Sequence, residues 1–142
     1  MKIKSKITKR DLLEIEKISH ERFGNESWTE AQFESSYSLD SSIFLVSFEK
    51  EKLVSFLIGQ DTVDSINILL LATEKEFEKK GFAGALVKEL AEKFKGKKLW
   101  LEVKESNSCA IKFYQKNGFK PVYTRKKYYK DGENAIILER EN

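Results

Sequence analysis

The apolar residues in the first third of the chain recur at helical intervals and predict two helices. The stripe of the first helix consists of Leu12, Ile15 and Ile18. Thr8 stands where an N-terminal cap is expected, with Asp11 three residues later, so this helix is expected from about Lys9 to Phe23. A second, short helix is expected to begin near Thr29, with Gln32 completing its cap.

Patterns typical of strands follow these helices. Ile43 to Phe48 and Leu53 to Ile58 are β-branched and aromatic runs on either side of the polar positions 49–52, which predicts a hairpin. Ser65 to Thr73 is a third run. Its centre, Leu69 to Leu71, is continuously apolar, and such a run is typical of a strand that is covered on both faces.

The second half of the chain alternates between helix and strand patterns. In chain order we expect a helix over Gly81–Phe94, a strand over Lys98–Val103, a helix over Ser108–Lys116, and strands over Lys120–Tyr128 and Asn134–Arg140. Asn117 and Gly118 follow the last helix, and this pair suits a left-handed C-terminal cap. The mixture predicts a central sheet with helices on both faces.

Length and composition fit one domain over residues 1–142. Apolar residues make up 40% of the chain and charged residues 35%, which indicates a folded globule rather than a disordered tail. The apolar runs, such as Ile66 to Ala72, are too short to span a bilayer. The single cysteine, Cys109, excludes an internal disulfide, so a reducing cytoplasm is the expected location.

The formal net charge of +3 is small, and lysines alternate with glutamates over residues 74–80. This alternation indicates a solvated surface rather than a nucleic-acid patch. Two basic clusters, at residues 93–98 and 125–127, leave two alternatives open: contact with a phosphate or an acidic partner, or a plain solvated face. We expect neither direct nucleic-acid binding nor a membrane partner.

Small residues surround the start of the helix that is expected from Gly81. Glycine or alanine occupies positions 81, 83, 84 and 85, which keeps side chains away from the first turn. The first N–H groups of a helix have no partner within it, and the helix dipole adds positive potential there. A diphosphate can therefore bind the backbone, with Lys79 and Lys80 adding charge. Close packing is the alternative reason for small residues at this place.

Several spaced motifs connect this turn with a known family. The turn resembles motif A of the GNAT superfamily, Gln/Arg-x-x-Gly-x-Gly/Ala, which reads Glu78-x-x-Gly81-x-Ala83 here. Leu99 to Asn107 resembles the Leu-Glu-Val-Arg-x-Ser-Asn element of one branch, and Ala110 to Phe119 resembles its Phe/Tyr-Tyr-x-x-x-Gly-Phe signature. That branch comprises the bacterial RimI-type alanine N-acetyltransferases, which modify a small-subunit ribosomal protein.

Two further segments agree with that branch. Ser27 to Glu30 resembles its Pro-Trp-Ser element, and Arg125 to Tyr129 resembles its Arg-x-x-Tyr-Tyr element. The likeness covers almost the whole chain. The sequence departs from the family at Glu78, a negative charge where the family has Gln or Arg, and this puts the cofactor affinity in question.

The resemblance implies a fold and an activity. The fold is an α/β domain whose central mixed, mostly antiparallel sheet of about six to seven strands is splayed in the middle. The activity is acetyl-CoA-dependent transfer to the N-terminal α-amine of a protein, with a ribosomal-protein alanine as the expected acceptor and no metal. Two alternatives remain open: the same chemistry on a small-molecule amine or polyamine, and a non-catalytic interaction module. A monomer or weak homodimer is expected.

The resemblance also implies site residues. Glu102 is the expected general base, through a water, and Tyr114 the expected proton donor to the departing thiolate. The cofactor-binding residues that it implies are Leu71, Ala72, Thr73, Lys79, Lys80, Gly81, Phe82, Ala83, Gly84, Asn107 and Tyr114. The residues expected to bind the acceptor are Trp28, Tyr128 and Tyr129.

Each of these residues has a plainer reading. Glu102 could be a surface carboxylate paired with Lys104 or Lys98, and Tyr114 could be a core residue. Asn107 could cap a helix, which asparagine does well. Edge-strand packing explains Tyr128 and Tyr129 nearly as well as acceptor binding does. His20 is the only histidine, and a solvent-facing or capping role fits it better than catalysis.

Overall fold

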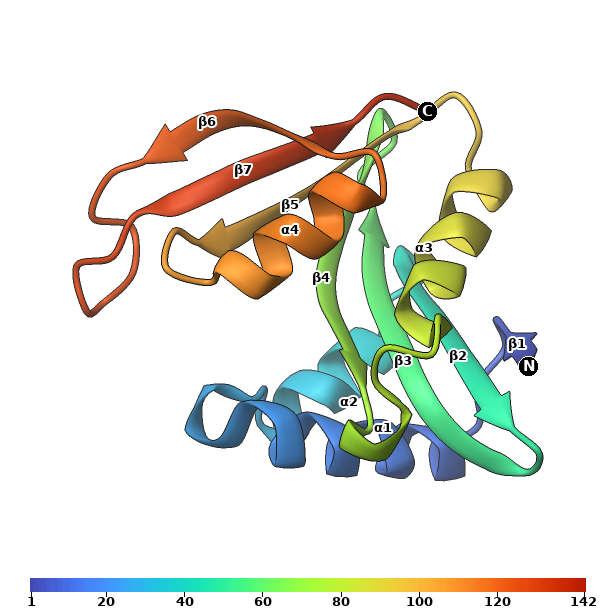
Figure 1. Ribbon diagram of the computed structural model, residues 1–142. Coiled ribbons are helices and arrows are strands. Elements are labelled where there is room, and N and C mark those ends of the chain that lie inside the picture. Colours follow the sequence, from blue (N-terminus) through green and yellow to red (C-terminus); the bar gives the residue numbers. More distant parts are fainter.

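The computed structural model describes residues 1–142 as a seven-stranded sheet flanked by four α-helices (Figure 1). The helices are α1 (Lys9–Phe23), α2 (Glu30–Ser38), α3 (Phe82–Lys93) and α4 (Ser108–Lys116), with short 3₁₀ turns η1 (Gly24–Glu26) and η2 (Lys75–Phe77). The strands are β1 (Lys2–Lys4), β2 (Ser42–Glu49), β3 (Lys52–Asp61), β4 (Ser65–Thr73), β5 (Lys98–Lys104), β6 (Lys120–Arg125) and β7 (Ala135–Arg140).

The strand order is β1-β2-β3-β4-β5-β7-β6, and only the central β4–β5 pair is parallel. This confirms the predicted mixed, mostly antiparallel sheet with helices on both faces. None of the helices has the length and apolarity needed to cross a membrane.

Local sequence signals set the helix boundaries. Both predicted capping boxes are present, because Thr8 and Asp11 bond each other's backbone N–H, as do Thr29 and Gln32. Each box satisfies backbone donors that the first helical turn leaves without a partner. Gly118 has a φ of 93° after α4, as the predicted left-handed cap requires.

Two hydrophobic cores lie on opposite faces of the sheet. One contains α1 and α2 side chains packed on β2 and β3, with Ile15 and Phe33 fully buried. The other contains α3 and α4 side chains packed on β2 to β5 and β7, with Leu86 and Leu99 fully buried. Figure 1 shows α1 and α2 beneath the sheet and α3 and α4 in front of it.

The centre of the sheet opens because β4 and β5 part soon after they meet. Their pairing covers only Ser65–Asn67 with Lys98–Trp100. Between Ile68 and Leu70 the register of β4 on β3 shifts, which leaves Leu69 as an extra residue. Such a bulge bends its strand and increases its twist, so it turns β4 away from β5 (Figure 1). We call the resulting gap the β4–β5 wedge.

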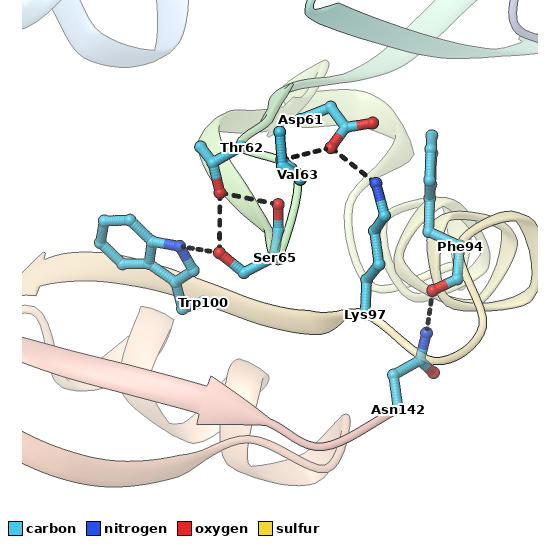
Figure 2. A network of polar contacts seen from close by, with 8 residues as sticks. All are labelled: Asp61, Thr62, Val63, Ser65, Phe94, Lys97, Trp100 and Asn142. Atoms are coloured by element: carbon cyan, nitrogen blue, oxygen red, sulfur yellow. Dashed lines mark hydrogen bonds and ion pairs between the residues drawn. The ribbon is translucent and has the colours of Figure 1, made fainter.

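A polar network secures the closed end of this wedge (Figure 2). Trp100 donates its indole N–H to Ser65 Oγ at 3.2 Å, which joins the beginning of β5 to the beginning of β4. Lys97 Nζ lies 2.8 Å from Asp61 Oδ1 and holds the start of β5 to the end of β3. Asn142 donates to Phe94 O at 2.9 Å, so the chain end binds the segment after α3. The two strands are therefore held together only where the wedge begins.

The structure differs from the strand predictions at three places. Leu69 to Leu71 are only partly covered. Leu70 packs against the α1–α2 core and Leu71 against the α3–α4 core beside the cleft, but Leu69 is 36% exposed and lines a separate hollow. The strand predicted to reach Tyr128 ends at Arg125, since Lys127 takes a left-handed φ of 51° that a strand cannot accommodate. β1 was not predicted, because three residues carry too little pattern. It pairs antiparallel with β2.

Candidate active site

A cleft of about 720 Å³ occupies the β4–β5 wedge. Its walls come from β4, the segment after η2, the first turn of α3, α4 and the C-terminal end of α1. The lining residues that the sequence predicted are Leu71, Ala72, Thr73, Lys79, Gly81, Phe82, Ala83, Gly84 and Tyr114. The wedge thus brings together residues that are separated by more than a third of the chain.

The first turn of α3 offers unpaired amides to this cleft. Gly81 is its N-cap, with a left-handed φ of 91° and no side-chain hydrogen bond. The backbone N–H groups of residues 79 to 84 have no hydrogen-bond partner in the protein. Lys79 is also left-handed, with a φ of 60°. Unpaired amides at a positive dipole end suit a phosphate, and the donor set fits that group.

β4 offers a second row of free backbone groups. Glu74 N–H donates to Val54 O of β3 at 2.8 Å. Ala72, two residues before Glu74, is paired with Phe56 in the β3–β4 register. Backbone groups of an antiparallel strand alternate between its two sides, so Ala72 bonds toward β3. The N–H and C=O groups of Leu71 and Thr73 therefore point into the wedge, where β5 has already parted from β4.

Tyr114 reaches the cleft from the opposite wall. Its ring packs at an edge-on angle against Phe113 and Phe119, and only 8% of the residue is exposed. Its hydroxyl makes no hydrogen bond within the protein, although the residue lines the cleft. Burial raises the pKa of the Tyr114 phenol well above its usual value. The side chain is therefore a core residue whose hydroxyl borders the cleft and stays protonated.

Glu102 lies on the other face of β5. The strand alternates, so that Leu101 and Val103 enter the α3–α4 core while Glu102 faces the side of α1 and α2. The Glu102 side chain is 22% exposed, and its Oε1 lies 3.7 Å from Arg125. Neither predicted lysine partner contacts it. Glu102 does not line the cleft itself.

The lysines predicted beside Glu102 bind elsewhere. Lys98 pairs with Glu139 at 3.3 Å. Lys104 bridges Glu26 of η1 and Asp131 of the β6–β7 loop, at 3.1 and 3.0 Å. These two carboxylates raise the pKa of Lys104 and keep it charged. The bridge joins two loops that flank the Glu102 face.

Tyr128 and Tyr129 pack edge-on in the β6–β7 loop on this same side. Arg125 lies over the Tyr128 ring and Lys104 over the Tyr129 ring. Burial raises the pKa of Tyr129, and the nearby Glu102 raises it further. Both tyrosines thus lie near Glu102, as an acceptor site would require.

Three further predicted residues, besides Glu102 and the two tyrosines, also lie outside the cleft. Trp28 packs on Phe33 and lines a separate hollow on the α2 side. Lys80 places its Nζ over the Phe77 ring. Asn107 caps α4 by accepting from Ala110 N–H at 3.2 Å, which is the capping alternative. Roles for these three residues in binding stay predictions.

Sequence reasoning missed several cleft residues, which are Arg22, Phe23, Phe77, Cys109, Ala110, Phe113, Lys116 and Asn117. Most stand in ordinary helix positions, and only tertiary packing brings them to the wedge. Asn117 carried a signal that was used for the helix end alone. No group of three His, Cys, Asp or Glu side chains is arranged to hold a metal ion.

Comparison with known proteins gives this site a context. Residues 10–119 match the family described as "Acetyltransferase (GNAT) family". The ribosomal protein bS18-alanine N-acetyltransferase of Escherichia coli is 31% identical over 117 residues, which cover 78% of each chain.

Solved structures agree with this match. The crystal structure of the Escherichia coli ribosomal-protein-S18-alanine N-acetyltransferase superposes with a TM-score of 0.86 at 29% identity, over 98% of this chain and 92% of that one. An aminoglycoside 6'-N-acetyltransferase in complex with coenzyme A gives a TM-score of 0.86 at 13% identity, over 99% and 96% of the two chains. The second likeness shows the fold alone.

Proposed function

Because the chain belongs to the acetyltransferase (GNAT) family and is an N-acetyltransferase, we propose that it transfers the acetyl group of acetyl-CoA to the N-terminal α-amine of a protein. We propose a ribosomal-protein alanine as the acceptor, in the cytoplasm. A relative of 31% identity is named for that acceptor, which supports the proposal. The observation that carries the proposal is the β4–β5 wedge. The N–H groups of residues 79 to 84 are unpaired beside it, and Tyr114 and Glu102 lie on opposite faces of the sheet there.

The wedge suits acetyl-CoA in three ways. The free amides of residues 79 to 84 match a diphosphate. The open edge of β4 at Leu71 and Thr73 matches the amides of a pantetheine arm, which would pair with it as a strand would. One N–H of that edge would also stabilise negative charge developing on the thioester oxygen. A protein of the same fold binds coenzyme A.

Acetyl transfer needs a neutral amine, and the proposed acceptor supplies one readily. An α-amine has a pKa of about 8, against about 10.4 for a lysine side chain, so much more of it is neutral near pH 7. A modest base is therefore sufficient. Glu102, on the face of Tyr128 and Tyr129, would take the proton from the attacking nitrogen through a water.

Tyr114 would complete the reaction from the other face. When the new C–N bond has formed and the C–S bond breaks, the sulfur leaves as a thiolate that needs a proton. The Tyr114 hydroxyl has no protein partner and stays protonated, so it is suited to donate one. Glu102 and Tyr114 lie on opposite faces of the sheet at β5. The base would therefore act on the attacking nitrogen from one side, and the acid on the leaving sulfur from the other.

Glu102→Gln tests this assignment. With a peptide that begins with alanine, we expect acetyl addition, measured by mass spectrometry, to fall by about 100-fold or more. Acetyl-CoA binding should be retained, because Glu102 does not line the cleft. Glu105→Gln, an exposed change on the same segment, is the matched control and should keep full activity.

The substrate itself is tested with a panel of acceptors. Acetylation of α-amines in peptides that begin with alanine supports the proposal. Transfer to polyamines but not to peptides would replace it with small-amine acetylation. No detectable binding of acetyl-CoA would leave a non-catalytic module.

A further inference from the structure

Glu78 places a carboxylate beside the unpaired amides of residues 79 to 84, the segment proposed above to bind the diphosphate, which we call the phosphate-binding turn. It lines the cleft, and its side chain is 41% exposed. The turn attracts anions through its free N–H groups, so an uncompensated carboxylate there would repel a diphosphate. The charge needs a counter-ion if the turn is to bind its ligand.

Arg22 supplies this counter-ion from a distant part of the chain. It lies in the last turn of α1, and its Nη2 donates to Glu78 Oε2 at 2.9 Å across 56 residues of sequence. Its side chain is 29% exposed and also lines the cleft. No other acidic side chain pairs with Arg22.

We propose that Arg22 is a positioning residue for cofactor binding, which acts by neutralising Glu78. This rests on the proposed function, because it assumes that the cleft binds acetyl-CoA. An exposed ion pair adds little to folding stability, so its main effect is on the potential at the cleft. The pair also ties the end of α1 to the phosphate-binding turn. Arg22 therefore acts through Glu78, and its charge matters only while Glu78 is charged.

A double-mutant cycle tests this coupling through the Kd of coenzyme A, measured by calorimetry at low salt. Arg22→Met keeps the apolar stem and removes the charge, and we expect Kd to rise about 3- to 10-fold. Glu78→Gln should bind at least as tightly as the native chain. The double variant should return to within about twofold of native, because neither the charge nor its counter-charge remains. The Arg22→Met effect should shrink at high salt.

Lys4→Met is the matched control. Lys4 pairs with Asp11 at the other end of α1 at 2.9 Å, and its side chain is 34% exposed. This variant should leave the Kd of coenzyme A unchanged. If disturbing α1 weakened coenzyme A binding in general, the Lys4→Met variant would also bind more weakly.

Two results would overturn the inference. A double variant that binds coenzyme A as weakly as Arg22→Met would mean that Arg22 binds phosphate directly or has only a structural role. An Arg22→Met variant that binds like the native chain would mean that the pair is irrelevant to binding. Failure of the native chain to bind coenzyme A is a different result, since it removes the proposed function itself.

Discussion

Tyr114 is a core residue to which we assign the proposed proton donation. Its ring is packed between Phe113 and Phe119, while its hydroxyl is left without a protein partner beside the cleft. Burial raises the pKa of the phenol. The group therefore remains a proton donor at pH values where an ordinary tyrosine, with a pKa of about 10, would be half ionised.

Tyr114→Phe should keep the packing and lose the proton. We expect kcat to fall by about 100-fold with a small change in the Kd of coenzyme A, measured by steady-state kinetics and calorimetry. In the native enzyme, ionisation of Tyr114 should cause no fall in kcat below about pH 10, because burial keeps the phenol protonated. Tyr37→Phe, which removes a hydroxyl bonded to Ile7 O, is the control. Equal losses in both variants would contradict the assignment.

Glu16 is a buried carboxylate that the proposed mechanism does not use. It is 7% exposed, its Oε2 has no hydrogen-bond partner, and burial, followed by Glu30 and Glu34, raises its pKa. Folding therefore favours its protonated form. Its contribution to stability is fully present below the usual carboxyl pKa of about 4.3, and it is lost as pH rises through the folded pKa.

Glu16→Met should therefore stabilise the protein at neutral pH. We expect the free energy of unfolding at pH 7 to increase by about 1 kcal/mol, because the variant removes a buried group without a partner. The gain should shrink at pH 4. Urea denaturation at both pH values measures it, with the exposed Glu14→Met as control. A loss of stability at pH 7 would show that Glu16 has a partner in solution.

An expected role could be assigned to a single residue only where a motif pointed to it, and these roles stay predictions. Glu102 and Tyr114 were proposed from the motif resemblance, since alternation alone reads Glu102 as a surface carboxylate. Arg22 was not predicted, because its partner Glu78 lies 56 residues away and nothing local marks the pair.

At the scale of elements, the start of α3 depends on one glycine. Gly81 has a φ of 91°, and a Cβ there would meet no atom within 4 Å. A substitution is therefore strained in its backbone but free of clashes. Gly96 has the same φ of 91° and the same open surroundings, but its N–H donates to Asn142 O at 2.8 Å.

Gly81→Ala and Gly96→Ala separate backbone strain from binding. Each should lose about 1 kcal/mol of stability, because an alanine disfavours the left-handed region. Only Gly81→Ala should weaken coenzyme A binding, since only its amide belongs to the unpaired set. Thermal unfolding and calorimetry give the two quantities. Comparable weakening in Gly96→Ala would show that the effect is general destabilisation.

Most element boundaries were predictable because their signals are local. The capping boxes at Thr8 and Thr29 and the turn at Gly118 each need only a few neighbouring residues. β1 was missed because a three-residue strand depends on its pairing with β2 rather than on its own pattern. The end of β6 was missed because the left-handed Lys127 is not a residue type that marks a turn.

At the scale of the whole molecule, the cleft follows from an incomplete sheet. β4 and β5 pair over three residues at their start, the bulge at Leu69 then turns β4 away, and the gap holds the cleft. The apolar run at Leu69 to Leu71 predicted a strand covered on both faces, but Leu70 and Leu71 are only half-buried and Leu69 is exposed. Hydropathy alone cannot separate a strand that is packed on both faces from one that lines a cleft.

The most direct test of the account is an NMR titration of the amide signals with coenzyme A. We predict that the amides of residues 79 to 84 and those of Leu71 and Thr73 shift as the ligand is added, while those around the Trp28 hollow stay in place. Shifts concentrated at that hollow, or none at residues 79 to 84, would contradict the account.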